Sequence, residues 1–365
     1  MKPLPTFEQL FATMPAVRSH APGRVNLMGD HTDYNGGFVL PAAIPQTTRV
    51  ELVPSSGRTV KVWSSACPDR PPAEYELGRE VPDGRWTDYI KGMTAVLADY
   101  GLRSGFSARI DSGVPSGSGL SSSAALEIAL GRALREAFGL ALTDVELAKA
   151  GQRAENELVG APVGIMDQMA CSFASPAAAI LLDTRSLEFQ HVPLPAGAGL
   201  IVIDSGLKHR HAGGAYGDRR RECADAARLL QVKELRDVNE DDLARASLPE
   251  PFARRARHVV TENRRVHETA AAIRRGDLAR AGSLFVESHA SLRDDFVVSV
   301  PAVDELVRIL SSIEGVYGAR LTGGGFGGSV IGLARADRAR AAADEAAQDY
   351  DTRTGNRSAV IVPAG

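Results

Sequence analysis

Apolar positions along this chain follow two spacings, and each spacing predicts one kind of element. Spacing of three and four residues predicts helices over 6–14, 85–100, 124–138, 144–159 and 253–281. Strict alternation or short apolar runs predict strands over 25–28, 38–40, 50–65, 106–110, 179–182 and 200–204. The 365 residues are enough for one or two domains with sizeable cores, and the pattern indicates a second domain from about residue 186.

Two of these helices have recognisable ends. Gly139 follows the helix predicted over 124–138 and stops it. The helix predicted to end at about residue 159 starts with a capping box, formed by Thr143 and Glu146. Glu155 and Glu157 lie two positions apart on that second helix and so face different sides. At most one of the two carboxylates is therefore expected to face a functional site.

Composition and charge exclude several classes of protein. The chain carries 42 Lys and Arg against 45 Asp and Glu, a formal net charge of -3, which argues against a nucleic-acid binder. Its start lacks the apolar core of a signal peptide, and no stretch approaches the ~18 apolar residues of a membrane span. Three widely spaced cysteines suggest free thiols in a reducing compartment. We therefore expect a cytoplasmic protein that binds neither nucleic acid nor membrane.

The stretch from Val114 to Glu127, V-P-S-G-S-G-L-S-S-S-A-A-L-E, reads as a glycine-rich turn leading into a helix. Gly117 and Gly119 permit positive φ and a close approach of the backbone to a ligand. The serines at 121–123 place hydroxyl and N–H groups at the positive end of the helix. Such a lead-in suits phosphate binding. The alternative is an ordinary capped helix after a turn.

A polar loop from Gly29 to Gly37 lies between two predicted strands. It holds Asp30, His31 and Asp33 within four positions, and ionised carboxylates can accept hydrogen bonds from the hydroxyls of a polyol. A solvated hairpin turn is the alternative, since Asp-Tyr-Asn-Gly-Gly is good turn chemistry.

Three further residues are candidates for a site. Asp167 stands among apolar neighbours, where a carboxylate either caps a helix or has a chemical role. Tyr216 lies between glycines and could contact a ligand. Trp86 is most simply a core residue, with stacking on a base as the other reading.

A glycine-rich segment near the C-terminus fits a familiar pattern but not its usual meanings. Gly323, Gly325 and Gly328 match G-x-G-x-x-G, yet only about 37 residues follow, too few to complete a dinucleotide-binding unit or a protein-kinase lobe. A second phosphate loop or close packing of two backbones remains. The chain also lacks a P-loop, C-x-x-C, H-E-x-x-H and G-x-S-x-G.

Several of these stretches together resemble the GHMP small-molecule kinase superfamily, and within it the galactokinase family. Pro115–Ala124 matches the superfamily's P-x-x-x-G-L-x-S-S-A nucleotide loop, and Leu321–Ser329 resembles its C-terminal glycine motif. The most specific match is G-R-V-N-L-M-G-D-H-T-D-Y-N-G-G-F-V-L-P, supported by G-I-M-D-Q, W-x-x-Y-x-K-G and S-L-R-D-D-F. The resemblance implies a two-domain α+β fold with mixed sheets packed against helices and an active site in the cleft between the domains. We expect an N-terminal GHMP kinase domain over 1–185 and a C-terminal one over 186–365.

The resemblance also implies a role for individual residues. Asp167 would take the proton from the anomeric hydroxyl of a sugar, with Arg24 beside it to steady charge on the phosphoryl group. Ser123 and Glu155 would hold Mg²⁺, which prefers oxygen ligands. The implied ATP-binding residues are Gly117, Ser118, Gly119, Leu120, Ser121, Ser122, Ser123 and Trp86. The implied sugar-binding residues are Asp30, His31, Thr32, Asp33, Gly164 and Tyr216.

One position departs from the family pattern, since Asp30 stands where the family usually has Glu. The missing methylene draws the carboxylate back by ~1.5 Å. The expected reaction is transfer of phosphate from ATP to galactose, giving galactose 1-phosphate and ADP, by a monomer or weak dimer. Two alternatives stay open: a kinase for N-acetylgalactosamine, a pentose or a heptose, and a non-catalytic sensor of sugar and ATP.

Overall fold

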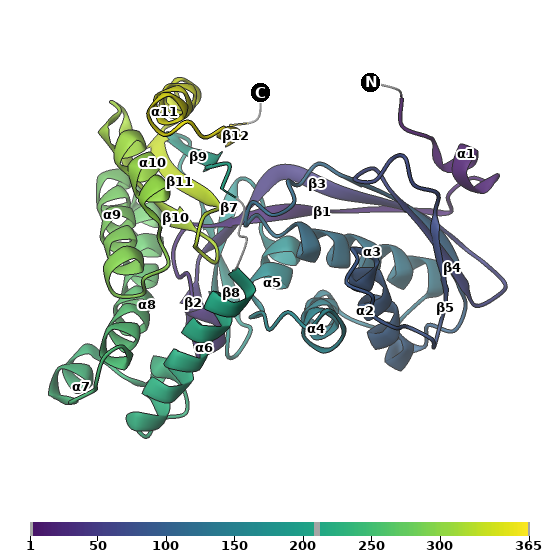
Figure 1. Ribbon diagram of the computed structural model, residues 1–365, viewed down its shortest axis with the longest axis horizontal. Coiled ribbons are helices and arrows are strands. Elements are labelled where there is room, and N and C mark those ends of the chain that lie inside the picture. The colour runs from purple at the N-terminus through teal and green to yellow at the C-terminus, as the bar shows by residue number, and fades with distance from the viewer. Residues whose placement is uncertain (1–2, 208–211, 364–365) are drawn as a thin grey trace. The chain divides into compact units, whose positions relative to one another are not determined.

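The computed structural model describes residues 3–207 and 212–363, which pack into two compact units (Figure 1). The first unit contains residues 3–23, 46–116 and 121–173, and the second contains the remaining described residues. Each unit is therefore discontinuous in sequence. The predicted boundary between two domains after residue 185 stays a prediction.

The first unit is a five-stranded sheet with helices on one face. Its strand order is β1 (Val17–Asn26), β3 (Pro41–Pro54), β6 (Phe106–Ser112), β4 (Thr59–Ser64) and β5 (Ala73–Glu76). The sheet is mixed, because β6 pairs antiparallel with β3 and parallel with β4. Figure 1 shows the helices α2 (Thr87–Leu97), α3 (Ser122–Phe138), α4 (Asp144–Ala154) and α5 (Met166–Phe173) beside this sheet. The short α1 (Phe7–Phe11) precedes β1.

The second unit is built around a four-stranded antiparallel sheet. Its order is β10 (Val316–Thr322), β11 (Ser329–Arg335), β9 (Ala198–Asp204) and β12 (Ala359–Val362). Its helices are α6 (Ala212–Leu229), α7 (Glu240–Arg245), α8 (Phe252–Arg275), α9 (Leu278–Asp294), α10 (Pro301–Ser312) and α11 (Ala339–Thr354). A small sheet, β2 (Phe38–Val39), β7 (Ala178–Asp183) and β8 (Phe189–Pro193), completes it.

The α+β class and the mixed sheets are confirmed, and most predicted elements appear within a few residues of their expected positions. The helix predicted over 253–281 is wrong as one element, because Gly276 adopts φ +73° and Asp277 caps a second helix, α9. The strand predicted over 50–65 is interrupted by a turn between β3 and β4. Short 3-10 turns also form at Asp33–Asn35, Ala98–Tyr100 and Leu235–Asp237.

The end of α4 differs from the prediction in a way that affects a candidate residue. A single helix was expected to about residue 159, but α4 ends at Ala154 and the chain continues as a π-helical turn, Glu155–Val159. Turns of this wider kind inside or after α-helices are frequent at functional sites. Glu155 begins this turn and is buried.

The segment 117–120 occupies an unusual place in the fold. The residues before and after it in the sequence pack in the first unit, but these four pack in the second. The chain therefore leaves one core for a single turn and then returns to begin α3.

No helix among residues 3–207 and 212–363 is both long enough and apolar enough to cross a membrane.

Candidate active site

A serine at the start of α3 is hydrogen-bonded to a carboxylate. Ser121 adopts φ +58° as the N-terminal cap of α3, and its hydroxyl donates a hydrogen bond of 2.5 Å to Oδ2 of Asp167. Asp167 lies in the first turn of α5 and is partly exposed. The contact fixes the orientation of this carboxylate beside the helix end that presents Ser122 and Ser123. Gly164, also predicted to face the sugar, is buried just ahead of α5.

The carboxylates of Glu127 and Glu155 are both buried in the same unit as Asp167. Burial raises the pKa of Glu127 on α3 well above its ordinary value, and the charges of Glu155 and Asp167 raise it further. Gln168 donates a hydrogen bond of 3.0 Å to Oε2 of Glu127. This environment favours the protonated form of Glu127 and would also stabilise a bound cation. Oxygen donors of this kind suit Mg²⁺.

The described residues contain no group of three or more His, Cys, Asp or Glu side chains arranged to hold a metal ion. A magnesium ion held by Ser123 and Glu155 would therefore take its other ligands from phosphate oxygens and water, as Mg²⁺ usually does. The donor set fits the ion on those terms.

A pocket of about 280 Å³ lies beside Trp86, at the start of α2. Its walls include Trp63 of β4, the half-buried Cys67 and the prolines at 71–72, with Arg70 and Arg85 also lining it. Aromatic and apolar walls with a few polar groups are typical of small-molecule pockets. Trp86 is therefore positioned to line a pocket as well as to pack.

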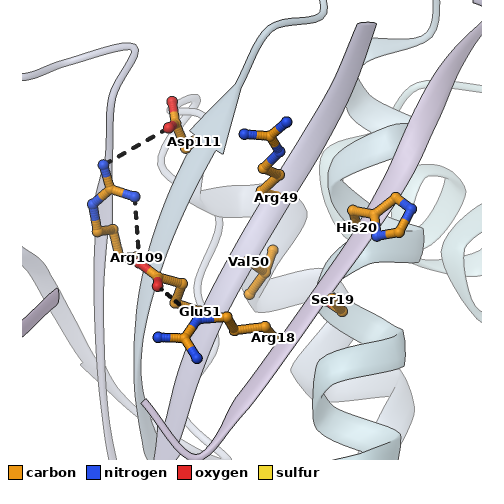
Figure 2. A pocket seen from close by; sticks show the side chains of 8 residues that line it. All are labelled: Arg18, Ser19, His20, Arg49, Val50, Glu51, Arg109 and Asp111. Atoms are coloured by element: carbon orange, nitrogen blue, oxygen red, sulfur yellow. Dashed lines mark hydrogen bonds and ion pairs between the residues drawn. The ribbon is translucent and has the colours of Figure 1, made fainter. Parts of the chain in front are cut away.

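A second pocket, of about 310 Å³, lies on the sheet of the first unit and contains none of the predicted site residues (Figure 2). Figure 2 shows ion pairs that link Arg18 of β1 to Glu51 of β3 and Glu51 to Arg109 of β6, with a further pair between Arg109 and Asp111 on the same strand. Partly exposed pairs of this kind contribute little to stability. The carboxylates offset most of the positive charge there, so this hollow is not a candidate for the active site.

In the second unit, Arg24 is attached to the glycine-rich turn. Arg24 is 5% exposed, and its backbone N–H donates to the carbonyl of Leu120 at 3.1 Å. Its Nη1 donates to the carbonyl of Gly119 at 2.6 Å. The guanidinium is thus held against the segment predicted to bind phosphate.

The polar loop after β1 is closed by its own side chains. Thr32 is fully buried and its hydroxyl lies 2.7 Å from the carbonyl of Gly29 and 2.6 Å from that of Phe38. His31 adopts φ +64°, and its Nδ1 lies 2.9 Å from the hydroxyl of Tyr34. Burial lowers the pKa of His31 to about 3, so the imidazole is neutral at physiological pH.

Tyr216 of α6 joins this loop. Its ring centroid lies 5.4 Å from that of His31 and 5.6 Å from that of Tyr34. Asp33 is partly exposed at the start of the 3-10 turn. The loop therefore gathers Asp33, Tyr216 and the neutral His31 in one part of the second unit.

The carboxylate of Asp30 accepts hydrogen bonds from other groups of the protein. Arg320, which is fully buried at the end of β10, donates to Oδ2, and the backbone N–H of Gly323 donates to Oδ1 at 3.0 Å. Glu262 of α8 lies 3.7 Å from the same guanidinium nitrogen. Burial raises the pKa of Asp30, while the Arg320 charge opposes the shift. Both carboxylate oxygens thus have partners within the second unit.

Comparison with known proteins assigns this arrangement to a family. Residues 88–175 match the family described as GHMP kinases N terminal domain, 269–352 match GHMP kinases C terminal, and 5–54 match the galactokinase galactose-binding signature. Galactokinases of Chloroflexus aurantiacus and of Roseiflexus sp. are each 43% identical to this chain over 98% of its length and 93% of theirs. The chain belongs to the galactokinase family of GHMP kinases.

Solved structures agree with this family. A Lactococcus lactis galactokinase, determined in complex with galactose, superposes with a TM-score of 0.93 at 32% identity, over 98% of this chain and 97% of that one. The mevalonate kinase of Methanococcus jannaschii has a TM-score of 0.68 at 17% identity, covering 96% and 98% of the two chains, and so shares the fold. The resemblance to galactokinases and the two-domain GHMP kinase fold are confirmed.

Within this galactokinase-family chain, the predicted site residues fall into two sets. Asp167, Gly164, Glu155, Trp86 and the serines at 121–123 belong to the first unit. Arg24, Tyr216, the loop residues at 30–33 and the segment 117–120 belong to the second. The predicted pairing of Asp167 with Arg24 joins the two sets and stays a prediction.

Sequence reasoning missed three residues that the structure brings into these sets. Glu127 and Arg320 are charged residues inside apolar runs, A-A-L-E-I-A-L and V-Y-G-A-R-L-T, and that mismatch was a usable signal. The third is Asp204, at the end of β9, which accepts a hydrogen bond from Ser118. Nothing in the sequence near Asp204 pointed to a partner 86 positions away.

Proposed function

We propose that this chain transfers the γ-phosphoryl group of ATP to the anomeric hydroxyl of galactose, giving α-D-galactose 1-phosphate and ADP. The observation that carries the proposal is the carboxylate of Asp167, oriented by the hydroxyl of Ser121 at the start of α3, in a member of the galactokinase family. A bond forms between the anomeric oxygen and phosphorus, and the bond from phosphorus to the β,γ-bridging oxygen breaks.

Asp167 is the proposed base. It accepts the proton that the anomeric hydroxyl loses as the oxygen attacks phosphorus, and the negative charge of the leaving group remains on ADP. A positioned carboxylate within reach of the hydroxyl is the usual arrangement for this step. Its contact with Ser121 supports this role, because it holds one carboxylate oxygen in a defined direction.

The phosphates of ATP are proposed to bind along 117–123. Gly117, Ser118, Gly119 and Leu120 offer backbone groups, and the serines at 121–123 offer the N-terminus of α3 with its positive dipole. Arg24 adds a guanidinium held on the same turn by the carbonyl of Gly119. Phosphoryl transfer depends mainly on positioning and positive charge, and these groups supply both. The pocket beside Trp86 is proposed to take the base.

Mg²⁺ is proposed to bind to Ser123 and Glu155. Held by these two side chains, such an ion would supply positive charge to offset the charge that develops on the transferred phosphoryl group. Burial of Glu155 beside Glu127 supports the assignment, since two adjacent carboxylates in a buried place favour a cation.

The sugar is proposed to bind to the loop 30–33 with Gly164 and Tyr216. A kinase for a related sugar is the second candidate, because both oxygens of Asp30 have protein partners and this residue replaces the family's usual Glu. A substrate hydroxyl near this position would then meet Asp33, Tyr216 or His31 instead.

The test is ADP release from purified chain with Mg²⁺ and ATP over a panel of galactose, N-acetylgalactosamine, pentoses and heptoses. Turnover of galactose with the highest kcat/KM supports the proposal. Preference for another sugar by tenfold or more supports the second candidate. Binding of sugar and ATP without ADP release would refute catalysis and favour a sensor.

A further inference from the structure

The turn at 117–119 has one side chain by which it can be fixed. Gly117 adopts φ +79° and Gly119 φ +72°, and a Cβ on Gly117 would meet nothing within 4 Å. Glycine has the largest backbone freedom to lose on ordering. Ser118 stands between them and is 4% exposed. Ser118 is therefore the residue of 117–119 that can fix this turn through its own side chain.

The hydroxyl of Ser118 is turned into the second unit. It donates a hydrogen bond of 2.5 Å to Oδ2 of Asp204, the last residue of β9. The other carboxylate oxygen, Oδ1, accepts from the backbone N–H of Gly206 at 3.0 Å. Asp204 is thereby oriented by its own turn, and a hydrogen bond to an ionised acceptor is stronger than one between neutral groups.

The carbonyl of Ser118 is held by the neighbouring strand. Ser329, the first residue of β11, is fully buried and donates from its hydroxyl to this carbonyl at 2.7 Å. Ser329 and Asp204 are direct partners in the antiparallel pairing of β11 with β9. Two adjacent positions of one sheet therefore hold the side chain and the backbone of a single residue.

We propose that Asp204 is a positioning residue for the phosphate loop, acting through Ser118. This inference rests on the proposed binding of ATP along 117–123. Asp204 touches neither substrate in this scheme, and its carboxylate keeps the Ser118 hydroxyl occupied. The turn then offers the phosphates a preformed backbone instead of one that must be ordered on binding, a saving that improves affinity.

Three variants test this role. Asp204→Ala and Ser118→Ala remove the same hydrogen bond from opposite ends. Asp204→Asn keeps one acceptor oxygen for Ser118. The matched control is Ser299→Ala, which removes another 2.5 Å hydrogen bond from serine to aspartate, Ser299 to Asp304, in the same unit. Each variant is examined as the full chain.

Steady-state kinetics with ATP and galactose give the first readout. We expect Asp204→Ala and Ser118→Ala to raise the KM for ATP about tenfold, near the low end for a hydrogen bond to a charged group. The KM for galactose should change by less than about twofold. The double variant should be no worse than either single one, because both remove one bond. Asp204→Asn should recover most of the ATP affinity, and Ser299→Ala should leave it unchanged.

Hydrogen exchange of the peptide covering 117–120, without ATP, gives a readout that is independent of turnover. Exchange should quicken in Asp204→Ala and Ser118→Ala but not in Ser299→Ala. A natively folded Asp204→Ala with unchanged or tighter ATP binding and unchanged exchange would overturn the inference. If wild-type chain releases no ADP with galactose, the proposed function fails, while the exchange experiment still decides whether Asp204 holds the loop.

Discussion

At the scale of single residues, burial decides what the charged groups can do. Asp30 is 1% exposed and Arg320 is fully buried, and each loses its hydration on folding. Taking charges out of water is costly unless they are paired and hydrogen-bonded. Arg320 meets the condition through Asp30 and the carbonyls of Asn26 and Leu27 at 3.2 and 2.9 Å. These contacts join the segment 26–30 to β10 within the second unit.

Replacing Asp30 with alanine should destabilise the protein more than it harms sugar binding. The change leaves the buried Arg320 charge without its main partner, at a cost of about 3–5 kcal/mol. We expect the melting temperature to fall by at least about 5 °C. The double variant Asp30→Ala with Arg320→Met should regain part of this loss, since the unpaired charge is gone.

Asp33→Asn serves as the contrast, with a raised KM for galactose and a small change in melting temperature. A normal melting temperature for Asp30→Ala, with a large rise in KM, would instead identify Asp30 as a sugar ligand.

Replacing Asp167 with asparagine should abolish turnover and leave sugar affinity largely intact. The amide has nearly the same shape but cannot accept the proton from the anomeric hydroxyl. We expect kcat to fall at least about 10²-fold, in the range for loss of a general base. ADP release measures kcat, and calorimetry measures the dissociation constant of galactose. A variant that keeps near wild-type kcat would exclude Asp167 as the base.

At the scale of elements, α9 packs on the sheet of the second unit with its backbone in close contact with the backbone of β10. A Cβ added to Gly282 of α9 would lie 2.3 Å from the carbonyl oxygen of Tyr317 in β10. A Cβ added to Gly318 would lie 2.1 Å from the carbonyl oxygen of Gly282. Neither obstacle is a flexible side chain, so the two glycines set the distance between α9 and β10.

Gly282→Ala should therefore separate this helix from the strand. Overpacking costs of about 1–3 kcal/mol are typical, and a backbone obstacle places the expected loss near the upper end. The matched control is Gly214→Ala in α6, where an added Cβ meets nothing within 4 Å. That substitution should be neutral or stabilise by up to about 1 kcal/mol through helix propensity. Melting temperatures of the two variants check the contrast, and equal values would contradict it.

At the scale of the whole molecule, each unit is assembled from segments far apart in the sequence. Residues 24–45 and 117–120 pack with the C-terminal half, whereas 46–116 pack with the N-terminal one. The second unit also buries histidines beside the polar loop. Burial lowers the pKa of His31 to about 3 and that of His258 to about 4. His258 contacts Ser291 at 2.9 Å and the carbonyl of Asp30 at 3.1 Å.

These histidines should make the protein sensitive to mild acid. The unfolded chain takes up protons near pH 6.5, but the folded histidines stay neutral down to about pH 3–4. Stability is therefore complete above pH 6.5 and falls as the pH drops, by up to about 1.4 kcal/mol per histidine and pH unit. Asp30 offsets part of this loss in more acid solution, because burial raises its pKa.

Denaturation midpoints between pH 7.5 and 5 measure this dependence. His258→Gln should reduce the slope by about one proton, whatever its effect on stability at neutral pH. An equally steep slope in the variant, or a flat profile in wild type, would show that His258 does not carry the effect.

The sequence by itself determined the elements and the family. Hydrophobic spacing located the main helices and strands, because amphipathic periodicity reflects which face is buried. Local signals located ends, as with the capping box at Thr143 and Glu146, where both reciprocal hydrogen bonds form. The glycine-rich turn and the polar loop were identified from residue types at fixed spacing, since backbone freedom and hydrogen-bonding capacity are properties of short segments.

Only the tertiary structure decided which distant groups meet. Asp30 was predicted to bind sugar hydroxyls, and no local pattern reveals that it also pairs with Arg320, 290 positions away. Ser118 was predicted among the ATP-binding residues, and its hydrogen bond to Asp204, 86 positions away, likewise has no local signal in the sequence. Periodicity records whether a residue is buried but not which side chain it is buried against. Electrostatic pairing inside a protein depends on that second fact, because each contact is set by the packing of whole elements.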